Sequence, residues 1–210
     1  MSTLVEALAG VSAVICVVTA DQALPAAKSA ASCLSEGVLY LDMNSVAPAT
    51  KRAAAEAIEA AGGRYVDVAI MAPVKPARLA VPLLVSGAHA GVAADRLAEL
   101  GFDQVRAVGN EVGQATTIKM LRSVMIKGVE ALTAEMMLGA RAAGVAPDVL
   151  ASLGRDWPEK ADYNLERMAT HGARRAAEME EAAITLAALG VEPVMTRGTI
   201  VRQREAAACQ

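Results

Sequence analysis

The sequence predicts an α/β domain built on a mostly parallel sheet, followed by an all-helical domain, with one long inter-domain helix joining them. In the first half of the chain, short β-branched runs alternate with alanine-rich helical stretches, which is typical of a parallel sheet with helices on its faces. After about residue 110 the strand pattern disappears and only helical spacing remains. We therefore expect an α/β domain at 1–109 and a helical domain at 110–210.

Five strands are expected, and several of them are apolar almost throughout, as strands covered on both faces should be. They lie at residues 12–18, 37–43, 64–70, 82–87 and 104–109. Helical stretches separate the first three runs from one another and the fourth run from the fifth. Asp21 and Ser45 stand near plausible helix starts, and Gly62 and Gly101 supply helix stops.

The long helix is expected at residues 113–143, which contain no proline. Its apolar side chains recur on one stripe, formed by Ile118, Leu121, Met125, Leu132 and Met136. Its N-terminal half also carries basic residues. Lys119, Arg122 and Ser123 share one side, because positions three and four apart are neighbours on a helix. Lys127 is expected to be a surface or interface charge, and a second substrate contact is the less favoured alternative.

Composition narrows the classes of function. The 210 residues carry a formal net charge of −3, with basic residues dispersed among acids, so we expect no nucleic-acid partner. No apolar run approaches the roughly 20 residues of a membrane helix. The three cysteines, Cys16, Cys33 and Cys209, lack metal-ligand or redox spacing and fit a reducing, cytoplasmic location. We expect no metal site.

A parallel sheet beside a helical domain is typical of dinucleotide enzymes, which grip the pyrophosphate with a glycine-rich turn before a helix. The sequence contains no G-x-G-x-x-G and no G-x-x-x-x-G-K motif. Spacing alone therefore predicts an incomplete α/β domain with a helical domain, and it does not predict a cofactor.

The order of five sequence motifs resembles that of a known protein family, and the resemblance covers essentially the whole chain. The chain resembles the β-hydroxyacid dehydrogenase superfamily, which includes 3-hydroxyisobutyrate and 6-phosphogluconate dehydrogenases. It is most similar to the branch with a DUF1932 domain at the C-terminus. The motifs that carry the resemblance are LYLDMNSVAPAT, GGRYVDVAIMAP, PLLVSG, VGQATTIKMLRSVMIKGVEAL and YNLERMATHGARRAAEMEE.

The resemblance implies a Rossmann-like dinucleotide-binding domain at 1–109 that is truncated, lacking the first βαβ unit and its glycine-rich turn. A truncated product, an engineered fragment, a natural short form or supply of this unit by another chain would all fit. Loss of about three charge-assisted hydrogen bonds, each worth roughly 1.5–3 kcal/mol, predicts that this chain binds NAD or NADP weakly.

The resemblance also implies roles for individual residues. Cofactor contacts would come from the loop after the first expected strand and from the D-M-N-S motif, namely Val18, Thr19, Ala20, Asn44 and Ser45. Lys119 aligns with the catalytic lysine, and Arg122 and Ser123 stand where relatives bind substrate. Met71, Ala72 and Pro73 occupy the substrate-binding segment, where they replace a serine and two glycines. That change suits a larger or less acidic substrate.

Oxidation of an alcohol needs a group that accepts the hydroxyl proton, and a lysine serves when burial lowers its pKa. The resemblance thus predicts an NAD(P)-dependent oxidoreductase that acts on a hydroxy acid or related small molecule, with Lys119 as general acid and base. The resemblance also implies that the helical domain (110–210) binds substrate and pairs subunits into a homodimer. Two alternatives remain open, a non-catalytic dimerisation or scaffold module and an enzyme that reduces imines.

Overall fold

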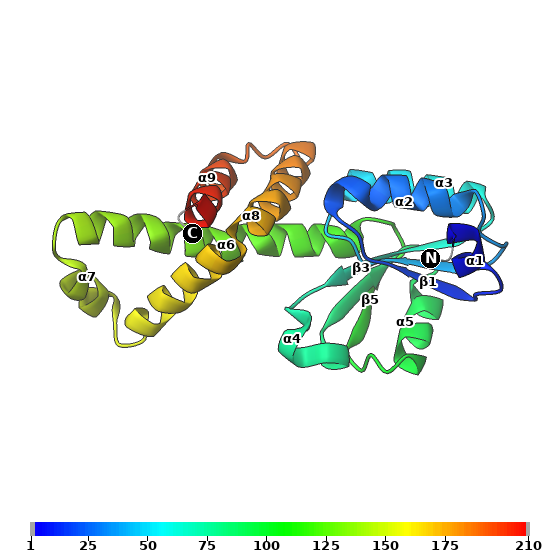
Figure 1. The fold of residues 1–210 in the computed structure, drawn as a ribbon, viewed down its shortest axis with the longest axis horizontal. Helices are drawn as coiled ribbons and strands as arrows, with labels where there is room; N and C mark the ends of the chain where they lie inside the picture. Colours follow the sequence, from blue (N-terminus) through cyan, green and yellow to red (C-terminus); the bar gives the residue numbers. More distant parts are fainter. Residues whose placement is uncertain (1–2, 209–210) are drawn as a thin grey trace. The chain divides into compact units, whose positions relative to one another are not determined.

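The computed structural model describes residues 3–208, and the chain forms two compact units that divide between Lys119 and Met120. The first unit is α/β and the second is helical (Figure 1). The division falls inside a long helix, ten residues after the boundary that the end of the strand pattern predicts. The first turns of that helix belong with the sheet because two polar side chains of the sheet bind them, as described below.

The first unit contains one five-stranded sheet in the order β1-β2-β3-β4-β5 (Figure 1). Pairs β1–β2, β2–β3 and β4–β5 are parallel and the pair β3–β4 is antiparallel, so the sheet is mostly parallel, as predicted. The strands are β1 (Ala13–Cys16), β2 (Leu39–Asp42), β3 (Arg64–Ile70), β4 (Leu83–Ser86) and β5 (Val105–Gly109). All five lie within or on the ranges expected from β-branched runs.

Helices cover the two faces of this sheet (Figure 1). α2 (Ala23–Ala31) and α3 (Pro48–Ala60) pack on one face, and α5 (Ala90–Glu99) packs on the other. Small alanine side chains at the helix surfaces let the helices approach the larger aliphatic and tyrosine side chains of the strands. Each core is closed by alternate residues of the same strands, because successive side chains point to opposite faces.

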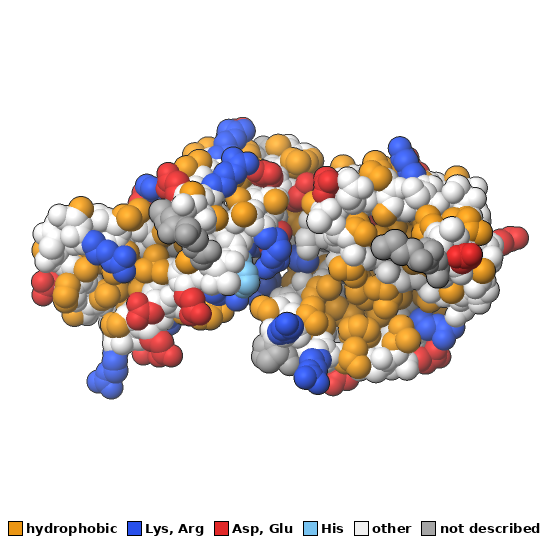
Figure 2. Space-filling model, in the orientation of Figure 1, with side chains coloured by type: hydrophobic (Ala, Val, Ile, Leu, Met, Phe, Trp, Pro, Cys, Tyr) orange, Lys and Arg blue, Asp and Glu red, His pale blue; other side chains and the backbone are white. Residues whose placement is uncertain are grey.

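β1 departs from the expectation that the strands are covered on both faces. Val14 and Cys16 pack toward α2 and α3, but Ile15 on the other face is 45% exposed. β1 is an edge strand, and α5 lies against β3, β4 and β5. Figure 2 shows a broad apolar surface on this unit beside α5.

Four short elements had no counterpart in the sequence analysis. They are α1 (Leu4–Leu8), η1 (Ala20–Gln22), α4 (Val74–Ala77) and η2 (Arg78–Ala80). Each is too short for hydrophobic periodicity to reveal it. Only α1 carries a local start signal, a capping box in which Thr3 and Glu6 bind one another's backbone N–H.

The second unit is formed by helices. They are α6 (Gln114–Ala142) from Met120 onward, α7 (Ala146–Leu153), α8 (Trp157–Ala188) and α9 (Val194–Ala208). α8 and α9 pack closely at Gly172, where a Cβ would collide with the carbonyl oxygen of Gln203. Met120 and Met179 fill the adjoining core with Ala176. The long helix predicted at 113–143 is therefore confirmed as α6.

Two further observations concern thiols and membranes. Cys16 and Cys33 are free thiols, and Cys209 lies outside the described residues. Across residues 3–208, every helix is either too short or too polar to cross a bilayer.

The start of α6 is bound to the sheet by the buried carboxylate of Asp67 on β3. Asp67 Oδ2 accepts from the main-chain N–H groups of Gly113 and Thr116 at 3.1 and 3.0 Å, and Oδ1 accepts from Thr116 Oγ1 at 2.6 Å. Ser86 Oγ on β4 accepts from the N–H of Ala115 and donates to Asp67. These bonds satisfy N–H groups that a helix start leaves without partners.

Gly113 permits this close approach. Its φ is +102°, and a Cβ there would lie 3.0 Å from the Cβ of Pro48 on α3. Any other residue would be strained by the backbone conformation and crowded by the helix start of α3. The turn before α6 therefore requires glycine.

Asp67→Ala should lower the free energy of unfolding by about 3–5 kcal/mol, because it removes one of the two carboxylates that pair with the buried Lys51 and leaves the N–H groups of Gly113 and Thr116 without their acceptor. Urea denaturation measures this change. Asp103→Ala, at an exposed loop position, is the matched control and should change stability by no more than about 0.5 kcal/mol. Equal, small effects of the two variants would show that the Asp67 carboxylate does not anchor α6.

Candidate functional site

The carboxyl ends of β1 and β2 lie side by side, because the two strands are parallel and paired. Val18 follows β1 and Asn44 follows β2. The Asn44 Oδ1 atom accepts a hydrogen bond from the main-chain N–H of Val18 at 2.7 Å. Asn44 is itself held by Asp42, whose Oδ1 accepts from its main-chain N–H at 2.9 Å and its Nδ2 at 2.8 Å. The loop after β1 is thereby fixed to the end of β2.

Lys119 meets the same strand end from α6. Its Nζ donates a hydrogen bond to Ser45 Oγ at 2.5 Å, and both residues are half-buried. The bond to Ser45 orients the ammonium group at the strand end. The structure therefore brings together Val18, Asn44, Ser45 and Lys119, which we call the candidate site.

Asp42, which holds Asn44, also belongs to a buried polar network that the sequence pattern did not predict. Lys51 on α3 forms ion pairs with Asp42 at 3.0 Å and with Asp67 at 3.4 Å. Tyr65 on β3 donates its hydroxyl to Asp42 Oδ2 at 2.6 Å. Burial, reinforced by the charge of Asp42, raises the pKa of Tyr65 far above its usual range, so it stays a donor. No spacing signal distinguishes Lys51 from an ordinary helix-surface lysine.

Apolar side chains at the rim of the candidate site are exposed. Val17 and Val18, directly after β1, are 66% and 42% exposed. Thr19 is exposed and Ala20 is half-buried at the start of η1. Ligands of open α/β sheets bind outside the carboxyl ends of strands, and an apolar rim with a few polar groups suits a flat heteroaromatic ring.

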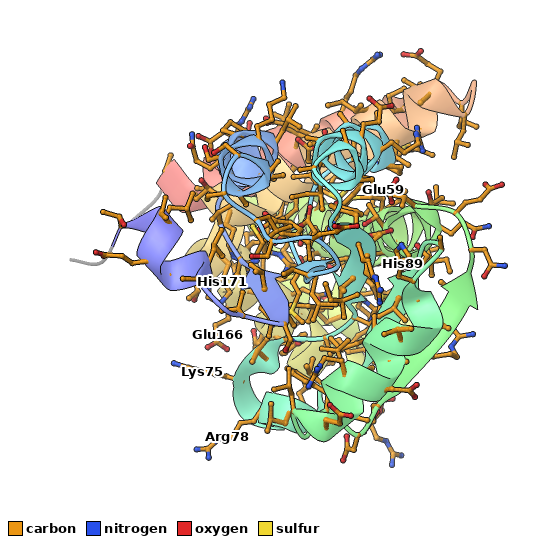
Figure 3. All side chains as sticks on the ribbon, turned by 90° about the vertical axis from the view of Figure 1, so that its right-hand side faces the viewer. Glu59, Lys75, Arg78, His89, Glu166 and His171 are labelled. Atoms are coloured by element: carbon orange, nitrogen blue, oxygen red, sulfur yellow. The ribbon has the colours of Figure 1, made fainter. Side chains whose placement is uncertain are left out.

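The segment Met71–Pro73 directly follows β3. The N–H of Met71 donates to the carbonyl oxygen of Pro82 at 2.9 Å, and its side chain packs on a small cluster that includes Ala115 of α6. Beyond it, Lys75 and Arg78 extend away from the chain on α4 and η2 (Figure 3). Ala72 is half-buried and Pro73 is exposed. Their predicted role in substrate binding stays a prediction.

Arg122 and Ser123 follow Lys119 on α6 but belong to the second unit. Arg122 is exposed, and Ser123 is buried and accepts a hydrogen bond from Lys127 Nζ at 3.1 Å. Lys127 also forms an ion pair with Glu178 of α8 at 2.9 Å. The expectation that Lys127 is a surface charge is therefore wrong. Helix spacing did not reveal that α8 covers this side of α6.

The structure brings no metal-ligand group together within residues 3–208: no three His, Cys, Asp or Glu side chains are placed to hold an ion. His89 belongs to the first unit and His171 to the second; both are labelled in Figure 3. His89 precedes α5, and His171 is exposed on α8.

Several known proteins are similar to this chain. Residues 140–206 match a domain of unknown function, DUF1932. A conserved hypothetical protein from Sinorhizobium meliloti is 42% identical, with 97% of this chain and 70% of that chain covered and a TM-score of 0.81. A conserved protein of unknown function, whose structure reveals similarity with 3-hydroxyacid dehydrogenases, is 35% identical over 91% and 73% of the two chains, with a TM-score of 0.75.

A curated relative, an uncharacterized 28.5 kDa protein from Methanothermus fervidus, is 27% identical over 165 residues, which are 77% of this chain and 63% of that protein. The chain thus matches less than two thirds of that relative's length. At 18% identity the fold is shared with 3-hydroxyisobutyrate dehydrogenase from Salmonella typhimurium, at a TM-score of 0.72 over 96% and 76% of the chains. It is shared at the same identity with a protein named Psf3 in complex with NADP⁺, at a TM-score of 0.70 over 100% and 79%. The fold of the first unit is Rossmann-like.

Because the ammonium of Lys127 is buried, its contribution to the free energy of unfolding should depend on pH. Burial lowers its pKa below the ordinary value of 10.5, against the opposing attraction of Glu178. Between the folded and unfolded pKa values the unfolded chain binds more protons, so the contribution of Lys127 to stability rises with pH in that window. The free energy of unfolding of the wild type minus that of Lys127→Met should rise from neutral pH toward 10.5, measured by urea denaturation. A difference that stays flat or falls would contradict this description of Lys127.

Proposed function

The chain belongs to the β-hydroxyacid dehydrogenase superfamily, in the branch that carries a DUF1932 domain at its C-terminus, and we propose that it acts as an NAD(P)-dependent oxidoreductase. The proposed reaction interconverts a hydroxyl-bearing carbon and a carbonyl in a small hydroxy acid. The single observation that carries this proposal is the hydrogen bond from Lys119 Nζ to Ser45 Oγ at the carboxyl edge of β2. It places a proton donor and acceptor beside the loop that Asn44 holds.

The residues at this edge fit the nicotinamide end of NAD or NADP. Val18 offers an exposed apolar side chain that suits a ring face, and Thr19 and Ala20 follow it in the same loop. Ser45 offers a half-buried hydroxyl for the ribose, while the buried Asn44 amide would hold the loop in place. The nicotinamide cofactor, when bound, supplies or takes up the hydride. The sequence has no glycine-rich pyrophosphate turn, so we propose that this chain alone binds the cofactor weakly.

Lys119 serves the proton half of the proposed reaction. In oxidation its neutral amine takes the proton of the substrate hydroxyl, and in reduction its ammonium returns a proton to the carbonyl oxygen. Ser45 holds the nitrogen at a fixed position, which saves the ordering entropy of a long flexible side chain. Arg122, Ser123 and the segment Met71–Pro73 stay part of the proposal as substrate contacts.

A homodimer formed through the helical unit is a further part of the proposal. The apolar stripe expected on α6 is largely exposed in the chain, with Leu121 at 40%, Met125 at 68% and Leu132 at 55% exposure. A continuous apolar helix face of this kind is typical of a protein interface. It favours pairing, and it is compatible with both an enzyme and a scaffold.

Lys119→Ala should lower turnover by about 10²–10⁴-fold, because the proton would no longer have a positioned donor or acceptor. Initial rates with excess NADH or NADPH over a panel of 3-oxo acids, with cyclic imines included, measure this. Lys28→Ala, an exposed lysine on α2, is the matched control and should keep the wild-type rate.

Equal rates for wild type and Lys119→Ala, or no turnover by the wild type with any substrate, would remove the assignment of enzymatic activity to this chain. Turnover of imines alone would replace alcohol chemistry by imine reduction.

A further inference from the structure

Lys51 takes no part in the proposed reaction, yet its side chain is fully buried in the first unit. Its Nζ has three acceptors, which are the main-chain oxygen of Asp42 at 2.6 Å, Asp42 Oδ1 at 3.0 Å and Asp67 Oδ1 at 3.4 Å. An ammonium has three N–H donors, so the three acceptors match its capacity. Both carboxylates are almost completely buried, and Lys51 is the positive charge that they share.

The first carboxylate controls the loop after β1. Asp42 Oδ1, the atom that pairs with Lys51, also accepts from the main-chain N–H and the Nδ2 of Asn44. Asn44 in turn accepts the N–H of Val18. A shift of the Asp42 carboxylate therefore moves the Asn44 amide and releases the loop.

The second carboxylate controls the start of α6. Asp67 Oδ1 pairs with Lys51 and accepts from Thr116 Oγ1, while Oδ2 accepts from the N–H groups of Gly113 and Thr116. Lys119 follows Thr116 by three residues on the same helix, which is about one turn. A helix transmits displacement of its first turn to the next, so Asp67 sets where Lys119 meets Ser45.

We propose that Lys51 is a positioning residue, which ties the loop of Val18 and the start of α6 to one ammonium and thereby fixes Lys119 beside Ser45. The ammonium attracts both carboxylates toward one point, whereas without it two buried like charges repel one another. The inference depends on the proposed function only for the importance of Lys119.

Amide hydrogen exchange of the full chain without cofactor tests this role. In Lys51→Met, which keeps the length of the side chain and removes the charge, the N–H groups of Val18, Asn44, Gly113 and Thr116 should exchange about tenfold faster or more. Two N–H groups of the same unit that lie outside the network, those of Met71 and Ala93, should keep their rates. Lys28→Met, at an exposed position of α2, is the matched control.

Faster exchange by the same factor at all six N–H groups would show that Lys51 only stabilises the core. Unchanged rates at the four network groups would show that Lys51 holds neither the loop of Val18 nor the start of α6. Either result overturns the proposal. If Lys51→Met does not fold, exchange of the wild type in low denaturant decides. The N–H groups of Val18, Asn44, Gly113 and Thr116 should then exchange with one common opening free energy. Different opening free energies for the loop of Val18 and the start of α6 would overturn the proposal.

The exchange result does not depend on catalysis. Selective acceleration in Lys51→Met together with a wild type that neither binds nicotinamide mononucleotide nor turns over substrate would leave the positioning role intact and refute the proposed function. Titration of the wild type with nicotinamide mononucleotide, followed by the amide signals of residues 17–20, 44 and 45, distinguishes the two failures.

Discussion

The candidate site depends on the hydrogen bonds that the buried carboxylate of Asp67 accepts from N–H groups at the start of α6. They join the middle of β3 to the first turn of α6, and α6 carries Lys119. A charged acceptor at a helix start is favourable because the positive end of the helix dipole and several unpaired N–H groups meet there. The cost of burying that charge is offset by Lys51 and by the hydroxyls of Ser86 and Thr116.

Two lysines of the first unit lie in different environments. Lys51 is buried, and its three donors point at oxygen atoms of Asp42 and Asp67. Such a group is held too firmly and too far from solvent to meet a substrate. Lys119 is half-buried at an edge of the sheet, where it binds the hydroxyl of Ser45. Its position suits exchange of a proton with a small molecule, and its placement is the result of the network around Lys51.

The arrangement of the sheet and the long helix was predictable because it rests on local patterns. Strand runs, alanine-rich helices and the proline-free stretch of α6 are each a matter of spacing over neighbouring residues. The family resemblance predicted that Lys119 lies near residues 44 and 45, whereas residue spacing alone did not. The ion pairs of Lys51 and Lys127 were beyond prediction, since each partner lies on another element and only packing brings them together. Exposure of Ile15 likewise follows from which strands α5 covers.

The most direct test of the central claim, that Lys119 and Ser45 face the nicotinamide ring, is a set of intermolecular nuclear Overhauser effects. The probe is nicotinamide mononucleotide at saturating concentration on the full chain. We expect cross-peaks from the ring proton at C4 to the side-chain methylenes of Lys119 and to Val18. Cross-peaks only to residues elsewhere in the unit, or a saturated ligand with no contact to Lys119, would contradict it.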